Sequence, residues 1–342
     1  MMKKIKKYFN IIMPLMLACS SLLSCTESGE PDTREGSVTL SFSTGAPITR
    51  AGDGDVSDGG GIKVTAGEPE LYVAIVNYVG DIVAKYPSTD SSSDCLEASA
   101  TQATIRFNGF TSSGAYTVYA VANTSGLWTM NSTLDAATTA SDLESLVFQE
   151  LAGTSTPAVS GAMPLSAKGT LMVNESLNGQ ADLDLLRCVG KVGYKFKNET
   201  DGALTLSDCV VTIHGINQSS GYLFSHTPDA AGSPRDLSFN KSSIVIPAGE
   251  STELYEMSKV FPSTAPEQSV GSRYLCDISF TLSGSAKSYT GLPIHDKKSQ
   301  DIPALQRNQY LQIETRINRG MNISFNFEVS GWDTLSEEIF FH

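Results

Sequence analysis

The stretch Ser37-Val-Thr-Leu-Ser-Phe-Ser-Thr44 alternates apolar and polar residues. Its apolar members, Val38, Leu40 and Phe42, fall on one side of an extended chain and the Ser and Thr residues on the other. This is the period-two pattern of a half-buried β-strand. A run rich in Gly and Asp, residues 51–61, follows shortly afterwards and has the composition of a linker. The sequence therefore predicts a well-formed strand that a flexible segment joins to the rest of the chain.

Strands of this kind recur along the 342 residues of the chain. Charged residues make up only 18% of it, Ser, Thr, Gly and β-branched residues abound, and helical periodicity is nearly absent. One helix is predicted, because Ser141-Asp-Leu-Glu144 fits a capping box ahead of an apolar run. Strands with short turns and no alternating helices predict β-sandwiches or Greek-key barrels, and the length suits two such domains. The clearest predicted strands cover residues 71–79, 82–86, 103–107, 116–123, 186–196, 274–282, 309–317 and 322–329.

The first 24 residues have the pattern of a bacterial secretory signal. Residues 1–7 are basic, and residues 8–17 form an apolar run too short to cross a membrane as a helix. The end of this segment, Leu22-Leu-Ser-Cys25, matches a lipobox, so Cys25 is the predicted lipidation site. A rival lipobox at Cys19 would cut the apolar run short. Several acyl chains on the new N-terminus would give a stable membrane anchor, and a plain secretory signal is the alternative.

Charge and motifs argue against several classes of function. The net charge of −13 argues against a nucleic-acid partner, because such a protein needs clustered Lys and Arg. None of the six Cys residues has zinc-ligand spacing, so they are interpreted as buried thiols or as disulfides of open pairing. None of the four His residues lies beside a nucleophile, and no phosphate loop or hydrolase motif occurs. We therefore expect no enzyme activity, no cofactor and no metal.

Several separated features together resemble the fimbrillins, the subunits of the type V pili of Bacteroidetes. The resemblance is a loose pattern spread over the whole chain, and it lies in the order of the features more than in any one of them. They are the lipobox with the acidic run 26–32 after it, Thr49-Arg50-Ala51 beyond the first strand, Met163-Pro164, Arg187-x-x-x-Lys191, Arg307-Asn308-Gln-Tyr310, and an alternating strand that ends at Trp332.

The resemblance implies an all-β protein with two transthyretin-like Greek-key β-sandwich domains in tandem and few short helices. Mapped onto this chain, it implies a signal peptide at 1–24, a propeptide at 25–50, an N-terminal domain at 51–185 and a C-terminal domain at 186–342. The family travels to the cell surface as outer-membrane lipoproteins. There an Arg-specific protease would cut between Arg50 and Ala51, and the mature subunit would join a fimbria.

The resemblance also implies a mechanism of assembly. Loss of the propeptide would remove the first strand, with Val38, Leu40 and Phe42, and would leave a groove that a strand from another pilus subunit fills. A cut after Arg34 would leave that strand attached, so it could not open the groove. If the last strand belongs to its own domain, the residues after Trp332 would have to donate instead. The candidate donor residues of the last strand alternate with polar residues, as the apolar residues of the first strand do. They are Ile323, Phe325, Phe327 and Val329.

Two questions of function stay open at this point. The flexible setting of Thr49-Arg50-Ala51 favours a stalk or tip subunit that contributes to adhesion, because an anchor subunit keeps its lipid and is not cut. The alternative class is a lipid-anchored surface lipoprotein that captures glycans on exposed aromatic side chains. Trp128 is the one candidate for such a platform in a loop.

Overall fold

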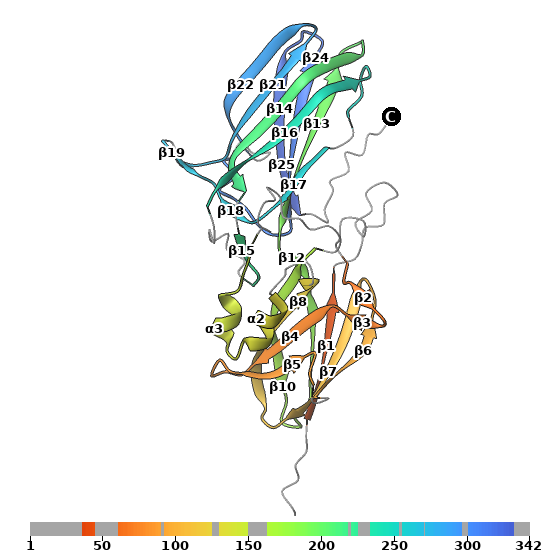
Figure 1. Cartoon of the computed structure of the whole chain (residues 1–342), viewed down its shortest axis with the longest axis vertical. Helices are drawn as coiled ribbons and strands as arrows, with labels where there is room; N and C mark the ends of the chain where they lie inside the picture. Colours follow the sequence, from red (N-terminus) through yellow and green to blue (C-terminus); the bar gives the residue numbers. More distant parts are fainter. Residues whose placement is uncertain are drawn as a thin grey trace, which may run out of the picture.

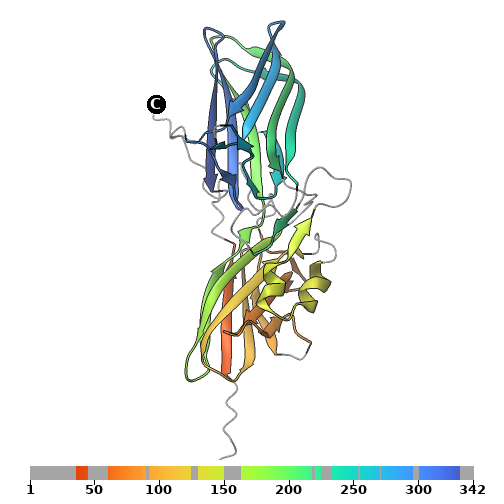
Figure 2. The same ribbon diagram turned by 90° about the vertical axis from the view of Figure 1, so that its left-hand side faces the viewer.

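A computed structural model describes the chain, and it is almost entirely β-structure, which confirms the all-β prediction. Figures 1 and 2 show two β-sandwich units placed end to end, the N-terminal strands in one and the C-terminal strands in the other. Within the described residues, none of the helices is long and apolar enough to cross a membrane. The structure describes residues 36–44, 61–89, 92–124, 130–149, 163–217, 220–224, 233–252, 255–269, 271–295 and 300–331.

The N-terminal unit is a nine-stranded sheet that folds over on itself. The hairpin of β10 and β11 joins its two halves through a single residue pair, Val173 with Gly179, and side chains of both halves share one core. A separate ribbon pairs β2 (Val64–Thr65) with β3 (Glu68–Pro69). Across the sheet the strands are β5 (Ile82–Tyr86), β4 (Leu71–Val76), β8 (Gly114–Ala122), β10 (Leu165–Val173), β11 (Gly179–Asp184), β1 (Gly36–Ser43), β7 (Gln102–Phe110) and β6 (Ser93–Ala98), with β12 (Leu186–Arg187) beside β10.

The C-terminal unit consists of two four-stranded sheets with one core between them. The predicted strand over residues 186–196 is interrupted at Cys188 and Val189, which separate β12 in the N-terminal unit from β13 in the C-terminal unit. One sheet has the order β17 (Tyr255–Val260), β13 (Gly190–Glu199), β24 (Gln309–Asn318) and β25 (Ile323–Gly331). The other has the order β16 (Arg235–Ile246), β14 (Leu204–Asn217), β21 (Leu275–Leu282) and β22 (Ser285–Pro293). Short pairs complete it: β18 (Ser263–Thr264) with β23 (Ala304–Leu305), and β19 (Glu267–Gln268) with β20 (Gly271–Ser272).

Two short helices lie beside the N-terminal sheet, and the predicted capping box is displaced by two residues. Thr139, not Ser141, caps the second helix: its hydroxyl accepts from the Asp142 amide at 3.2 Å, and the Asp142 carboxylate accepts from the Thr139 amide at 2.9 Å. Glu144 does not complete a box, because it accepts a hydrogen bond from the Tyr119 hydroxyl at 2.6 Å. The helices are α2 (Met130–Ala136) and α3 (Ala140–Glu144).

A further core cluster joins the helices, the N-terminal sheet and part of the C-terminal unit. β4 is buried on both faces, as its apolar run predicts, but it ends at Val76 and not at Val79, because a tight turn follows. One of its faces belongs to the sandwich core, and Tyr72 on the other packs in this cluster with Phe224 and Phe261. The short strands β9 (Val147–Gln149) and β15 (Ser220–Tyr222) pair here, so the two units are connected by packing and by a ladder.

Candidate functional site

The predicted first strand is an inner strand of the N-terminal sheet (Figure 1). β1 pairs antiparallel with β7 from Gly36 to Ser43 and parallel with β11 from Val38 to Ser43. In the strand order, β1 alone separates β7 from β11. Each neighbour keeps its other partner without β1, since β11 also pairs with β10 and β7 with β6. Removal of β1 would therefore leave two unpaired strand edges that face each other across a gap.

The apolar side chains of β1 point into the N-terminal core. Val38, Leu40 and Phe42 are 0% exposed, and the alternate residues of the strand are only half-buried, which confirms the predicted alternation. Burying an apolar side chain of this size contributes about 1.5–3 kcal/mol. The site of β1 would thus be an apolar groove if the strand were absent. The cross-strand neighbours of these side chains on β7, also buried, are Phe107, Ile105 and Ala103.

The two ends of the β1 site differ. At the Gly36 end the β10–β11 turn approaches so closely that a Cβ atom on Gly36 would lie 1.9 Å from the carbonyl oxygen of Leu177. At the other end, the Leu185 amide donates to the Ser43 carbonyl at 2.7 Å, and the Ser43 hydroxyl donates to the Asp184 carboxylate at 2.5 Å. Position 36 therefore admits only glycine. The Ser43 end is held by Asp184 and Leu185, which belong to the part of the chain that leads to the C-terminal unit.

The candidate donor residues form an edge strand of the C-terminal unit. β25 pairs antiparallel with β24 along its whole length and is the last strand in the order of its sheet. Phe327 is buried, whereas Ile323, Phe325 and Val329 are half-buried against the core. The Phe325 ring packs edge to face on Tyr289 of β22, with 5.3 Å between ring centroids. These residues therefore occupy their own unit, which is the alternative that the sequence left open, and a donor role for them stays a prediction.

Several predicted site residues lie outside the described part of the chain. They are the lipidation site Cys25, the cleavage pair Arg50 and Ala51, the loop residue Trp128, and the tail from Trp332 onward. β1 itself lies between two such segments, residues 1–35 and 45–60.

Two motifs of the resemblance meet at the junction between the units. Arg307, in the segment before β24, is 6% exposed. Its guanidinium donates to the carbonyl oxygens of Leu223 and Leu186, both at 2.9 Å, and to the Ser166 hydroxyl at 2.7 Å. Arg187, from the other motif, is buried as well. The Arg307 side chain thus ties the segment before β24 to the N-terminal unit.

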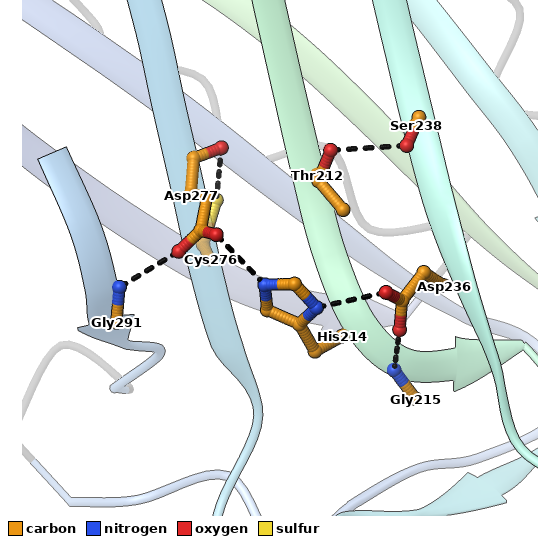
Figure 3. Close-up of polar contacts among 8 residues, drawn as sticks. All are labelled: Thr212, His214, Gly215, Asp236, Ser238, Cys276, Asp277 and Gly291. Carbon is orange, nitrogen blue, oxygen red and sulfur yellow. Dashed lines mark hydrogen bonds and ion pairs between the residues drawn. The ribbon is translucent and has the colours of Figure 1, made fainter. Parts of the chain in front are cut away.

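A polar cluster on the outer face of the sheet β16–β14–β21–β22 was not predicted (Figure 3). The His214 ring places Nδ1 2.9 Å from the Asp236 carboxylate and Nε2 3.0 Å from the Asp277 carboxylate. Each carboxylate also accepts a backbone N–H, from Gly215 at 3.0 Å and from Gly291 at 2.7 Å. No spacing motif could reveal this cluster, because the residues come from three strands that meet only through the sheet register.

Electrostatics distinguish this cluster from an ordinary surface histidine. Partial burial lowers the pKa of His214, but the bonds to the two carboxylates outweigh it, so the net pKa is raised. Burial acts on Asp277 in the upward direction, and the Gly291 amide and His214 outweigh it, so the pKa of Asp277 is lowered. Among the described residues, no group of His, Cys, Asp and Glu has an arrangement suited to a metal ion. The described cysteines, Cys95, Cys188, Cys209 and Cys276, are free thiols.

Comparison with known proteins supports the fold. No family model and no curated protein matches the sequence. The chain is a protein of two β-sandwiches in tandem. In particular, it has the fold of a candidate cell adhesion protein from Bacteroides eggerthii, with a TM-score of 0.50 and 14% identity over 87% of this chain and 96% of that chain.

Two further solved structures are similar over nearly the same span with lower scores. A fimbrilin from Porphyromonas gingivalis has a TM-score of 0.48 and 12% identity over 88% of this chain and 99% of that chain. A fimbrial assembly protein from Parabacteroides distasonis has a TM-score of 0.43 and 12% identity over 87% of this chain and 98% of that chain.

Proposed function

We propose that this chain is a structural subunit of a surface fimbria, which contributes to adhesion and polymerises by exchange of strands. The observation that carries the proposal is the position of β1. It is an inner strand that is paired on both sides and has three apolar side chains in the core, yet it is joined to the unit it completes only through residues 45–60. The similar fold of a candidate adhesion protein supports the same conclusion.

In this proposal the N-terminal segment delivers and protects the subunit. A lipid on Cys25 anchors the precursor to the outer membrane, and β1 fills its own groove until the chain reaches the surface. An Arg-specific protease then cuts between Arg50 and Ala51 and releases residues 25–50 with β1. The emptied groove has apolar walls and two unpaired edges, so a strand from a second subunit is its natural ligand.

We further propose that β25 is that strand. In its own unit it has one paired edge, and three of its four inward side chains are only half-buried, whereas the β1 site offers two edges and complete burial. Transfer therefore gains both hydrogen bonds and buried apolar area. The β24–β25 turn lies at the free end of the C-terminal unit, and the Gly36 end of β1 lies at the free end of the N-terminal unit (Figure 1). Subunits placed end to end would thus let β25 enter in the direction of β1.

Proteolysis of the purified precursor tests the proposal. Treatment with an Arg-specific protease should cut after Arg50 and give a ladder of oligomers on a denaturing gel run without boiling. Arg50→Ala should abolish the ladder, and Arg34→Ala, the matched control, should leave it intact. A cut monomer that stays monomeric would refute strand exchange and favour the alternative of a lipid-anchored glycan-binding protein.

A peptide competition identifies the donor. A synthetic peptide of residues 323–331 should cap the freshly cut subunit and suppress the ladder, because it fills the groove without carrying a second unit. A peptide of residues 333–341 should have no effect. The reverse result would assign the donor role to the residues after Trp332.

A further inference from the structure

His214, Asp236 and Asp277 form what we call the His214 clamp, which ties three neighbouring strands on the outside of the C-terminal unit (Figure 3). Asp236 lies on β16, His214 on β14 and Asp277 on β21. The hydrogen bond from the Gly291 amide to Asp277 extends the tie to β22, the fourth strand of the sheet. A single ring thus lies at the centre of a connection across the whole sheet.

The number of protons on the ring decides how many strands it can tie. An imidazolium has two N–H groups and can donate to both carboxylates, whereas a neutral imidazole has one donor and one acceptor nitrogen. Neither carboxylate can donate in return when it is ionised. In the neutral state one ring nitrogen would therefore present its lone pair to a carboxylate about 3 Å away, which is repulsive.

The side chains and backbone groups around the ring come from all four strands of the sheet. On β14 the side chain that precedes the ring on the same face is Thr212, which bonds to Ser238 of β16 at 3.0 Å. The charged groups that face the ring from the flanking strands are Asp236 and Asp277. From β22 the contribution is the backbone amide of Gly291, which has no side chain.

We propose that the His214 clamp is a protonation-dependent device that ties β16, β14 and β21 when the ring carries two protons and opens on the β16 side when it carries one. The β16 side opens because the Asp236 side chain is 54% exposed and Asp277 is 38% exposed, so water replaces the ring more readily at Asp236. The neutral ring would then keep its proton on Nε2, toward Asp277.

The pH range in which the clamp stabilises the fold follows from the difference between the folded and unfolded pKa values of His214. A histidine whose pKa is higher in the folded than in the unfolded chain stabilises the fold fully below about pH 6.5, the unfolded value. That stabilisation is lost as the pH rises through the raised folded pKa of His214. The clamp is therefore closed in mildly acidic solution and opens as the pH rises through that folded pKa.

Nitrogen NMR of the imidazole rings in the labelled full-length protein tests the proposal directly. At pH 6 both nitrogens of His214 should carry protons, the ring should lose a proton at a pH above the 6.5 of a free histidine, and the product should be the Nε2–H tautomer. A ring with one proton at pH 6, or a product with its proton on Nδ1, would overturn the proposal.

Variants supply a second readout. Unfolding of His214→Gln should lose the pH dependence that the unmodified protein shows between pH 6 and 9. His295→Gln is the matched control, since His295 lies 3.0 Å from the Asp301 carboxylate and outside the strands that the clamp ties. Equal pH profiles for both variants would refute the clamp. If His214→Gln fails to fold, the NMR titration of the unmodified protein still decides the question.

Discussion

At the scale of single residues, Leu40 offers the simplest test of the β1 site. It is the middle one of three β1 side chains in the core and is fully buried. Leu40→Ala would leave a cavity, and such changes cost about 2–5 kcal/mol of the free energy of unfolding. Chemical denaturation of the uncut precursor measures it. Thr39→Ala, one residue earlier on the half-buried face, should change stability by less than about 1 kcal/mol. Similar losses in the two variants would show that β1 does not complete the core.

Residue patterns along the chain predict which side chains face inward but not what they touch. The alternation of residues 37–44 identifies Val38, Leu40 and Phe42 as core, because period two is a property of one strand alone. The contact of Gly36 with Leu177 depends on a turn more than a hundred residues away, so no local pattern could reveal it. The partners of His214 are hidden for the same reason.

At the scale of elements, the existence of strands is easier to predict than their role. The alternating residues of β25 fit an edge strand of their own sheet and a donor strand equally well, because both bury one face. Only the pairing with β24 shows where the strand lies in this chain. The helix at residues 140–144 has a similar ambiguity, since both Thr139 and Ser141 can cap, and the contacts of Glu144 decide between them.

Tyr289 should help to hold β25 in its own unit. Its ring packs on Phe325 and connects the edge strands of the two C-terminal sheets. An aromatic pair of this geometry contributes about 0.5–1.5 kcal/mol, so Tyr289→Ala should speed hydrogen exchange of the β25 amides by about two- to tenfold. Tyr78→Ala is the control, because Tyr78 is 94% exposed in the β4–β5 turn. Unchanged exchange in Tyr289→Ala would mean that pairing with β24 alone holds the strand.

At the scale of the whole molecule, composition and length predict two sandwiches, but not how they are joined. The chain passes from the N-terminal to the C-terminal unit at Cys188 and Val189, close to the predicted boundary. Contacts nevertheless join the two sides: β9 pairs with β15, and Phe224 and Phe261 pack against the N-terminal unit. These contacts join segments from both units, so they depend on the finished fold. In the fibre proposed above, such a junction would carry the load from one unit to the next.

Arg307 is the residue on which that junction can be tested. Arg307→Met keeps most of the volume but removes the donors to Leu223, Leu186 and Ser166. Buried acceptors left without a donor cost about 1–3 kcal/mol each, and we expect the variant to lose about 2–5 kcal/mol in calorimetry or denaturant unfolding. Lysine should not rescue it, because one ammonium cannot reproduce the planar fork.

Arg319→Met is the matched control: its ion pair with Asp201 is 77% exposed on both sides, so its loss should cost no more than about 1 kcal/mol. If Arg307→Met unfolds in two separate steps while Arg319→Met unfolds like the unmodified chain, the guanidinium is what makes the two sandwiches one mechanical body. A single unchanged transition in both variants would instead assign that role to the apolar cluster around Phe261.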